Sequence, residues 1–162
     1  MAHSITLGVH TDRASRYAEL VPQVRSLLEG ETDGIAAMAN LAAAVHGAFD
    51  WHWTGFYRAI GDELVLGPFQ GPVACARIAL GKGVCGTAWK EERTMVVPDV
   101  DLFPGHIACS ALSRSEIVVP VRGKSGRVVA VMDIDSVVAD DFGPIDAKAL
   151  EELCAMLSPL FE

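Results

Sequence analysis

Three cysteines in the middle of the chain could carry redox chemistry. Cys75 and Cys85 lie in the segment GPVACARIALGKGVCGTAW and Cys109 in GHIACS. Cys109 follows a Pro-Gly turn in a loop, where its thiolate could be exposed enough to act as a nucleophile on which a second cysteine closes a disulfide. Each of the three could instead be a small buried hydrophobic residue, which we expect for the fourth cysteine, Cys154, beside an apolar helical stripe.

The spacing of the cysteines does not predict a metal site. No C-x-x-C pair occurs, and the only close pair of ligand types is His106 with Cys109. Structural zinc sites use closely spaced ligand pairs, so we expect no metal and no other cofactor. The same pair could be the nucleophile and base of a cysteine hydrolase, although two residues three positions apart on a loop are weak evidence for that arrangement.

A hairpin near the end of the chain brings acidic residues together. In EIVVPVRGKSGRVVAVMDID, a turn centred between Lys124 and Ser125 places Glu116 opposite Asp133, with Asp135 two residues along on the same face. The other face then carries Ile117, Val119, Val121, Val128, Ala130 and Met132. A slip by one residue would bury the carboxylates in this core, which favours the register.

Three carboxyl groups this close repel one another, so some must be protonated, solvated or neutralised by a cation. One interpretation is a solvated sheet edge. Another is a site for a ligand with an ammonium group, which a free amino acid carries and a residue within a peptide does not. Neighbouring carboxylates also raise the pKa of a carboxyl group, as a proton donor working at neutral pH requires.

Composition narrows the possible partners. The 162 residues are 51% hydrophobic, and we expect residues 1–162 to form one globular domain. The 13 basic and 21 acidic residues leave a net charge of −8, which disfavours nucleic acid and anionic membranes as partners. The first residues, MAHSITLGVHTDR, lack the basic start and apolar stretch of a signal peptide, so we expect a cytoplasmic location, where disulfides are transient.

Helices are predicted at both ends of the chain, with strands between them. Apolar residues at helical spacing predict helices over residues 11–29, 33–48 and 83–91 and from Pro144 to the end. Thr11 or Asp12 is expected to cap the first helix, and Pro22 to kink or divide it. Strands are predicted over residues 53–59, 64–69, 73–80, 94–97, 117–121 and 128–134, and a long loop over 99–114. This order predicts an α+β fold, with the terminal helices packed on a six-stranded, largely antiparallel sheet.

Five segments of the chain together resemble a known family. They are WTGFY (53–57), CARIALGKGVCGTAW (75–89), VVPDVDLFPGHIAC (96–109), SRSEIVVPV (113–121) and MDIDS (132–136). The chain resembles the free methionine-(R)-sulfoxide reductases, which are single GAF domains, and the resemblance covers nearly its whole length. It implies a GAF fold, reduction of free methionine-(R)-sulfoxide to methionine, thioredoxin as the reductant and a homodimer.

The resemblance also implies roles for the cysteines. Cys109 attacks the sulfoxide sulfur and becomes a sulfenic acid as methionine leaves, and Cys75 then forms a disulfide with it. Cys85 is an auxiliary or alternative resolving thiol, because its role differs between family members. Ser110 stands where the family often has an aspartate, so no local electrostatic role is expected there.

Substrate binding is implied for residues of two further motifs. Glu116, Asp133 and Asp135 gather round the ammonium group and the sulfoxide oxygen, and Glu116 is the first candidate for the proton donor. Trp53 contacts the S-methyl group, and Tyr57 of the same motif is a second binding residue. From its residue type alone, a tryptophan in a strand is more often part of the core. The alternative function for this fold is a sensor module, which would bind a small molecule without converting it.

Overall fold

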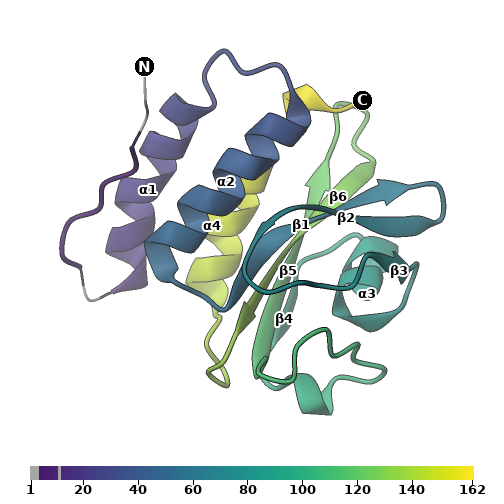
Figure 1. Ribbon diagram of the computed structural model, residues 1–162. Coiled ribbons are helices and arrows are strands. Elements are labelled where there is room, and N and C mark those ends of the chain that lie inside the picture. The colour runs from purple at the N-terminus through teal and green to yellow at the C-terminus, as the bar shows by residue number, and fades with distance from the viewer. Residues whose placement is uncertain (1–3, 11) are drawn as a thin grey trace.

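One six-stranded sheet forms the centre of the computed structural model, which describes residues 4–10 and 12–162. Its strands are β1 (Trp53–Ile60), β2 (Glu63–Gln70), β3 (Arg77–Ala79), β4 (Met95–Val97), β5 (Ser115–Arg122) and β6 (Val128–Ser136). Their order is β3-β2-β1-β6-β5-β4, and each neighbouring pair is antiparallel (Figure 1). The predicted sheet is confirmed.

The helices lie on both faces of this sheet. They are α1 (Arg13–Leu27), α2 (Gly34–Phe49), α3 (Gly83–Glu91) and α4 (Pro144–Ala155), with the 3-10 turns η1 (Val100–Leu102) and η2 (Ser158–Leu160). Helices α1, α2 and α4 cover one face, and α3 lies against the other (Figure 1). The predicted α+β architecture is therefore confirmed. No helix within these residues is both long and apolar enough to cross a membrane.

The sheet face beneath α1, α2 and α4 carries the larger apolar core. Its buried side chains are Phe56, Ile117, Val119, Val121, Ala130, Met132 and Ile134. They pack against fully buried helix residues, among them Leu20, Leu41 and Leu150. Removal of this apolar surface from water is the main force that holds the helices on the sheet, and the opposite face remains free to carry polar groups.

Helix α1 continues through its proline. Asp12 caps the helix by accepting a hydrogen bond from the Ser15 N–H at 2.9 Å, whereas Thr11, the other predicted cap, lies outside the described residues. Pro22 does not divide the helix, so that part of the prediction is wrong. Leu20 and Val24, on either side of the proline, are both fully buried and keep both parts of the helix on the core.

Strand β3 is shorter than predicted. Only Arg77–Ala79 pair with β2, and residues 73–76, which include Cys75, form an irregular segment. Val73 is a β-branched residue of the kind that favours strands, but its side chain is 90% exposed and does not pack in the sheet.

The register of the β5–β6 hairpin differs by two residues from the prediction. Glu116 pairs with Asp135, and Asp133 lies opposite Val118. The loop spans residues 123–127, centred on Ser125, and an irregularity between Val121 and Arg122 displaces the ladder by one further residue. Between the irregularity and the far end of the hairpin, a shift of two residues keeps every side chain on its predicted face. On the loop side of the irregularity, Val128 lies on the face that α3 covers, contrary to the prediction.

A buried polar network ties α1 to α4. Asp146, which is 3% exposed, accepts hydrogen bonds from Tyr17 Oη at 2.8 Å, Arg13 Nη1 at 2.9 Å and the Gly143 N–H at 2.9 Å. Arg13 also pairs with Asp141 and lies over the Trp51 ring, 5.1 Å from its centroid. The sequence does not predict this network, because the contacts of Arg13 and Tyr17 with Asp141 and Asp146 join residues 128 to 133 positions apart.

We expect Asp146→Ala to lower the free energy of unfolding by about 3 kcal/mol, because it leaves a buried phenol and a half-buried guanidinium short of a partner. Urea unfolding followed by circular dichroism measures this loss. Glu152→Ala on the same helix removes only the exposed pair with Arg25 and should cost less than about 1 kcal/mol. Equal losses in the two variants would contradict the role given to Asp146.

Candidate active site

Three carboxyl groups lie together on the sheet face that α3 covers. Glu116 of β5 and Asp133 and Asp135 of β6 all line one cavity between this face and α3. Glu116 is 5% exposed and Asp133 6% exposed, so these are not residues of a solvated sheet edge. The structure therefore places the three on a common face, as predicted, but buries Glu116 and Asp133 and leaves Asp135 half-buried.

Burial governs the charge of this cluster. It is the largest cause of the raised pKa of each carboxyl group, and repulsion from a neighbouring carboxylate raises each pKa further. Asp135 has this effect on Glu116, Glu116 on Asp133, and Asp133 on Asp135. Without a cation nearby, the cluster thus holds protons at a pH at which exposed carboxyl groups have lost them.

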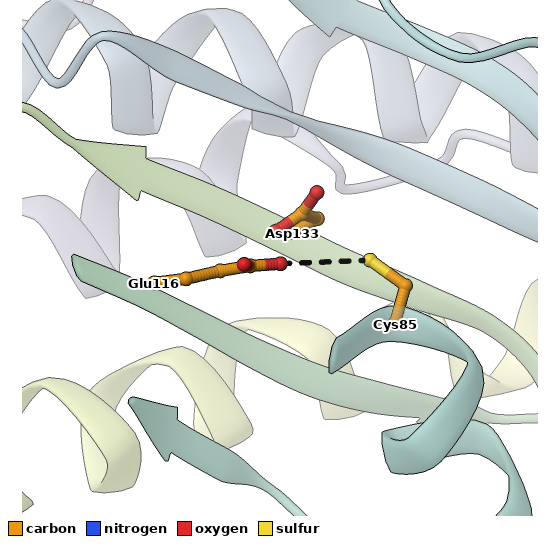
Figure 2. A group of neighbouring side chains, drawn as sticks. All are labelled: Cys85, Glu116 and Asp133. Atoms are coloured by element: carbon orange, nitrogen blue, oxygen red, sulfur yellow. Dashed lines mark hydrogen bonds between the residues drawn. The ribbon is translucent and has the colours of Figure 1, made fainter. Parts of the chain in front are cut away.

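Cys85 faces the same carboxyl groups from the first turn of α3. Its thiol donates toward Glu116 Oε1, with the sulfur and oxygen 3.9 Å apart, and Asp133 lies beside this pair (Figure 2). Burial, followed by the charges of Asp133 and Glu116, raises the pKa of the thiol well above its ordinary value. Cys85 is therefore a neutral thiol, which is a poor nucleophile despite its place at the start of a helix.

Cys75 and Cys109 form a disulfide, with Cα atoms 5.8 Å apart across 34 residues of chain. Cys109 lies exposed on the loop that follows η1, and Cys75 is half-buried in the segment before β3. Cys85 and Cys154 are free and buried. Cys154 packs in the core on the opposite side of the sheet, as expected for a small hydrophobic residue.

Aromatic side chains form one wall of the cavity. Trp53 is 5% exposed and stacks on Phe69 and Tyr57, with ring centroids 5.2 Å and 5.9 Å away. Tyr57 Oη donates to the Cys75 carbonyl oxygen at 3.0 Å, so this tyrosine also holds the segment that carries Cys75. Gly55 is required between Trp53 and Phe69, because a Cβ atom at this position would lie 2.6 Å from the Trp53 ring and 2.3 Å from Phe69 Cβ.

Most of the predicted site residues meet at this cavity. Its lining includes Trp53, Tyr57, Cys85, Cys109, Glu116, Asp133 and Asp135. Cys75 lies outside the lining and is joined to it through Cys109. The structure thus gathers residues from β1, α3, β5, β6 and the loop after η1 around a single space.

Two histidines were not predicted as site residues. His106 Nε2 lies 3.5 Å from Glu116 Oε2, but burial lowers the pKa of the imidazole and raises that of the carboxyl group, so the contact joins neutral groups. His52, the residue before β1, has its Nε2 atom 3.0 Å from Ser110 Oγ and so connects the start of this strand to the loop of Cys109. His106 lies three residues before Cys109 in the sequence and is a candidate there only as the base of a hydrolase, whereas the contact of His52 with Ser110 spans 58 residues.

Stability should fall with rising pH because of this cluster. Because their pKa values are raised in the folded state, these carboxyl groups bind more protons in the folded protein than in the unfolded chain. Their contribution to the free energy of unfolding is therefore fully present below the pKa of the unfolded state, 3.8 for Asp133, and is lost as pH rises through the pKa of the folded state. We expect Asp133→Asn to raise the free energy of unfolding by about 1 kcal/mol at pH 8 and to change it little at pH 4. Urea unfolding at both pH values tests this, and a loss of stability at pH 8 would contradict it.

A protein family model matches most of the chain and names the same fold. The family model described as "GAF domain" matches residues 33–162, which include the whole sheet and helices α2, α3 and α4. The chain therefore belongs to the GAF domain family.

Individual relatives narrow this class. A free methionine-R-sulfoxide reductase of Escherichia coli is 45% identical over 142 residues, 87% of this chain and 86% of the relative. One from Saccharomyces cerevisiae is 38% identical and covers 86% of this chain and 82% of its own. The crystal structure of the Neisseria meningitidis free methionine-R-sulfoxide reductase, in complex with its substrate, matches with a TM-score of 0.93 and 49% identity over 97% of this chain and 94% of its own. The chain belongs to the free methionine-R-sulfoxide reductases, which are enzymes.

Proposed function

We propose that this protein reduces free methionine-(R)-sulfoxide to methionine. The observation that carries the proposal is an exposed Cys109, joined to Cys75 in a disulfide, at a cavity lined by two buried carboxyl groups, Glu116 and Asp133, and by the half-buried Asp135. The names of the relatives from Escherichia coli, yeast and Neisseria support the same substrate.

In the proposed complex, the carboxyl cluster selects a free amino acid. The cluster holds both the ammonium group and the sulfoxide oxygen. The positive charge of the ammonium group compensates the carboxylates of Asp133 and Asp135, which burial otherwise keeps protonated, whereas Glu116 keeps its proton and faces the oxygen. A residue within a peptide lacks the charge of this ammonium group. Trp53 packs on the S-methyl group, and Tyr57 holds the Cys75 segment beside it.

The first chemical step transfers oxygen from the substrate to Cys109. The Cys109 thiolate attacks the sulfoxide sulfur, and Glu116 donates a proton to the sulfoxide oxygen as the sulfur–oxygen bond breaks. The raised pKa of Glu116 supports this role, since it keeps the carboxyl group protonated. The hydroxyl group then bonds to the Cys109 sulfur as the bond between this sulfur and the substrate sulfur breaks. Methionine leaves with its sulfur reduced by two electrons, and Cys109 becomes a sulfenic acid.

The second step regenerates the enzyme. The Cys75 thiol attacks the sulfenic sulfur of Cys109, water leaves, and the disulfide forms. Thioredoxin then supplies two electrons and two protons and becomes oxidised itself. The exposure of Cys109 supports this step, because a dithiol must reach one sulfur of the disulfide. We propose that the cycle runs in the cytoplasm, where a reducing thiol pool keeps such disulfides transient.

We also propose a homodimer, which rests on the resemblance to the family alone. Size-exclusion chromatography with light scattering tests it, and a monomer across the working concentration range would overturn it.

A substrate series tests the proposed function. Methionine formation is measured from the separate R and S epimers of the free sulfoxide and from a peptide-bound sulfoxide, with dithiothreitol as reductant. We expect turnover of the free R epimer only. Equal turnover of the peptide would show that the cluster does not select an ammonium group, and no turnover of any substrate would favour the sensor function.

A further inference from the structure

We infer that Cys85, Glu116 and Asp133 form a binding site for a thiophilic divalent cation of the Zn²⁺ type. These three residues are called the thiol–carboxylate cluster below. An ion bound there would occupy the position proposed for the substrate ammonium group and would block it. The inhibitory consequence rests on the proposed function, whereas binding of the ion does not.

The geometry of the thiol–carboxylate cluster suits one small ion. One ligand atom from each residue, the Cys85 sulfur and a carboxylate oxygen from Glu116 and Asp133, lies within 4.8 Å of the others. Zinc binds sulfur at about 2.3 Å and oxygen at about 2.1 Å, which places a sulfur and an oxygen on one tetrahedral ion about 3.6 Å apart. The observed distance from Cys85 Sγ to Glu116 Oε1 is 3.9 Å, so this pair needs little movement to share one ion.

A second observation points to a missing partner in the cluster. Asp133 is 6% exposed, and its Oδ1 atom has no hydrogen-bond donor among residues 4–10 and 12–162. A buried carboxylate oxygen without a donor or a counter-ion is costly. Asp133 lines the same cavity as the Cys85 thiol and lies beside the Cys85–Glu116 pair (Figure 2). An ion in that space would supply the positive charge that this oxygen lacks.

The donor set selects the class of cation. One sulfur with two carboxylates suits a borderline or soft ion, whereas Mg²⁺ and Ca²⁺ require six or more oxygen ligands. The set also leaves a fourth tetrahedral position for water. The ligands come from α3, β5 and β6 and are 31 and 17 residues apart, so a search for closely spaced ligand pairs could not detect them.

Direct binding is tested on the oxidised protein, in which the Cys75–Cys109 disulfide removes two competing thiols. Co²⁺ is the probe, because ligation by a thiolate produces a charge-transfer band in the near ultraviolet, and Zn²⁺ binding is measured by equilibrium dialysis. We expect one ion per chain, with the Co²⁺ band lost and Zn²⁺ affinity reduced about 100-fold or more in Cys85→Ser. Cys154→Ser is the matched control, since it alters the other buried thiol, on the opposite face of the sheet, and should retain the band.

Two results would overturn the site: no saturable binding to the wild-type protein, or equal binding to Cys85→Ser. Should Cys85→Ser fail to fold, as judged by circular dichroism, Glu116→Gln takes its place, because it keeps the shape of the side chain and removes one ligand. It should lower the affinity for Zn²⁺ to a similar extent, and an unchanged affinity would count against the site.

Competition tests the second half of the inference. Free methionine should displace Co²⁺ and abolish the band, and buffered Zn²⁺ should raise the KM for the sulfoxide without lowering kcat when thioredoxin is the reductant. An unchanged band at saturating methionine would overturn the shared site. A protein that binds Co²⁺ through Cys85 but never produces methionine would retain the ion site and refute the proposed function, so the two failures are distinguishable.

Discussion

Replacement of Cys109 by serine should abolish methionine formation. The proposed step needs a thiolate that can attack sulfur and then carry oxygen, and a serine hydroxyl does neither at neutral pH. Loss of a nucleophile lowers turnover by on the order of 10⁶-fold, which leaves only the background reaction with the thiol reductant. Methionine release from the free R epimer, followed by chromatography, measures the loss.

Cys75→Ser is the informative comparison, because Cys75 acts only after the first chemical step. With thioredoxin as reductant, this variant should release about one methionine per chain at the wild-type rate and then stall, since the sulfenic acid on Cys109 has lost Cys75 and the remaining candidate, Cys85, is a buried thiol with a raised pKa. A dimedone adduct on Cys109, detected by mass spectrometry, identifies the stalled state. Sustained multiple turnover of Cys75→Ser by thioredoxin would contradict the role given to Cys75 and would favour Cys85 as the resolving thiol.

Glu116→Gln should lower kcat by about 10²- to 10⁴-fold, the range for loss of a general acid. The amide keeps the size of the side chain but cannot give up a proton to the departing oxygen. In the wild-type protein burial raises the pKa of Glu116, so the carboxyl group keeps its proton to a higher pH than an exposed one does, and kcat should fall as pH rises through that pKa. The variant should lose this alkaline decrease. A pH profile of kcat for both proteins measures the effect.

Asp133→Asn separates proton donation from binding. Asp133 is proposed to contact the ammonium group and not the oxygen, so its replacement should raise KM more than it lowers kcat. The alkaline decrease in kcat should persist in this variant. If Asp133→Asn rather than Glu116→Gln removed that decrease, the proton donor would be Asp133, and the role given to Glu116 would be wrong.

The arrangement of the sheet was predictable because local patterns are strong in this chain. The run from Ile117 to Val121 is apolar throughout, so it is the acidic residues Glu116, Asp133 and Asp135 that mark which face of the hairpin turns away from α1, α2 and α4. The capping Asp12 marks the start of α1. The register of the hairpin was not predictable, because the loop centre and the irregularity near Val121 depend on hydrogen bonds that the residue types do not specify.

Sequence alone thus determined the elements, the common face of Glu116, Asp133 and Asp135, and the motifs that carry the family resemblance. Only the tertiary structure decided how far these carboxyl groups are buried and that Cys85 reaches them from α3. Burial depends on packing between segments far apart in the chain, and it is burial that raises the pKa values of the cluster. The same residue types on an exposed sheet edge would be ordinary solvated charges, without the proton or the cation site proposed for them here.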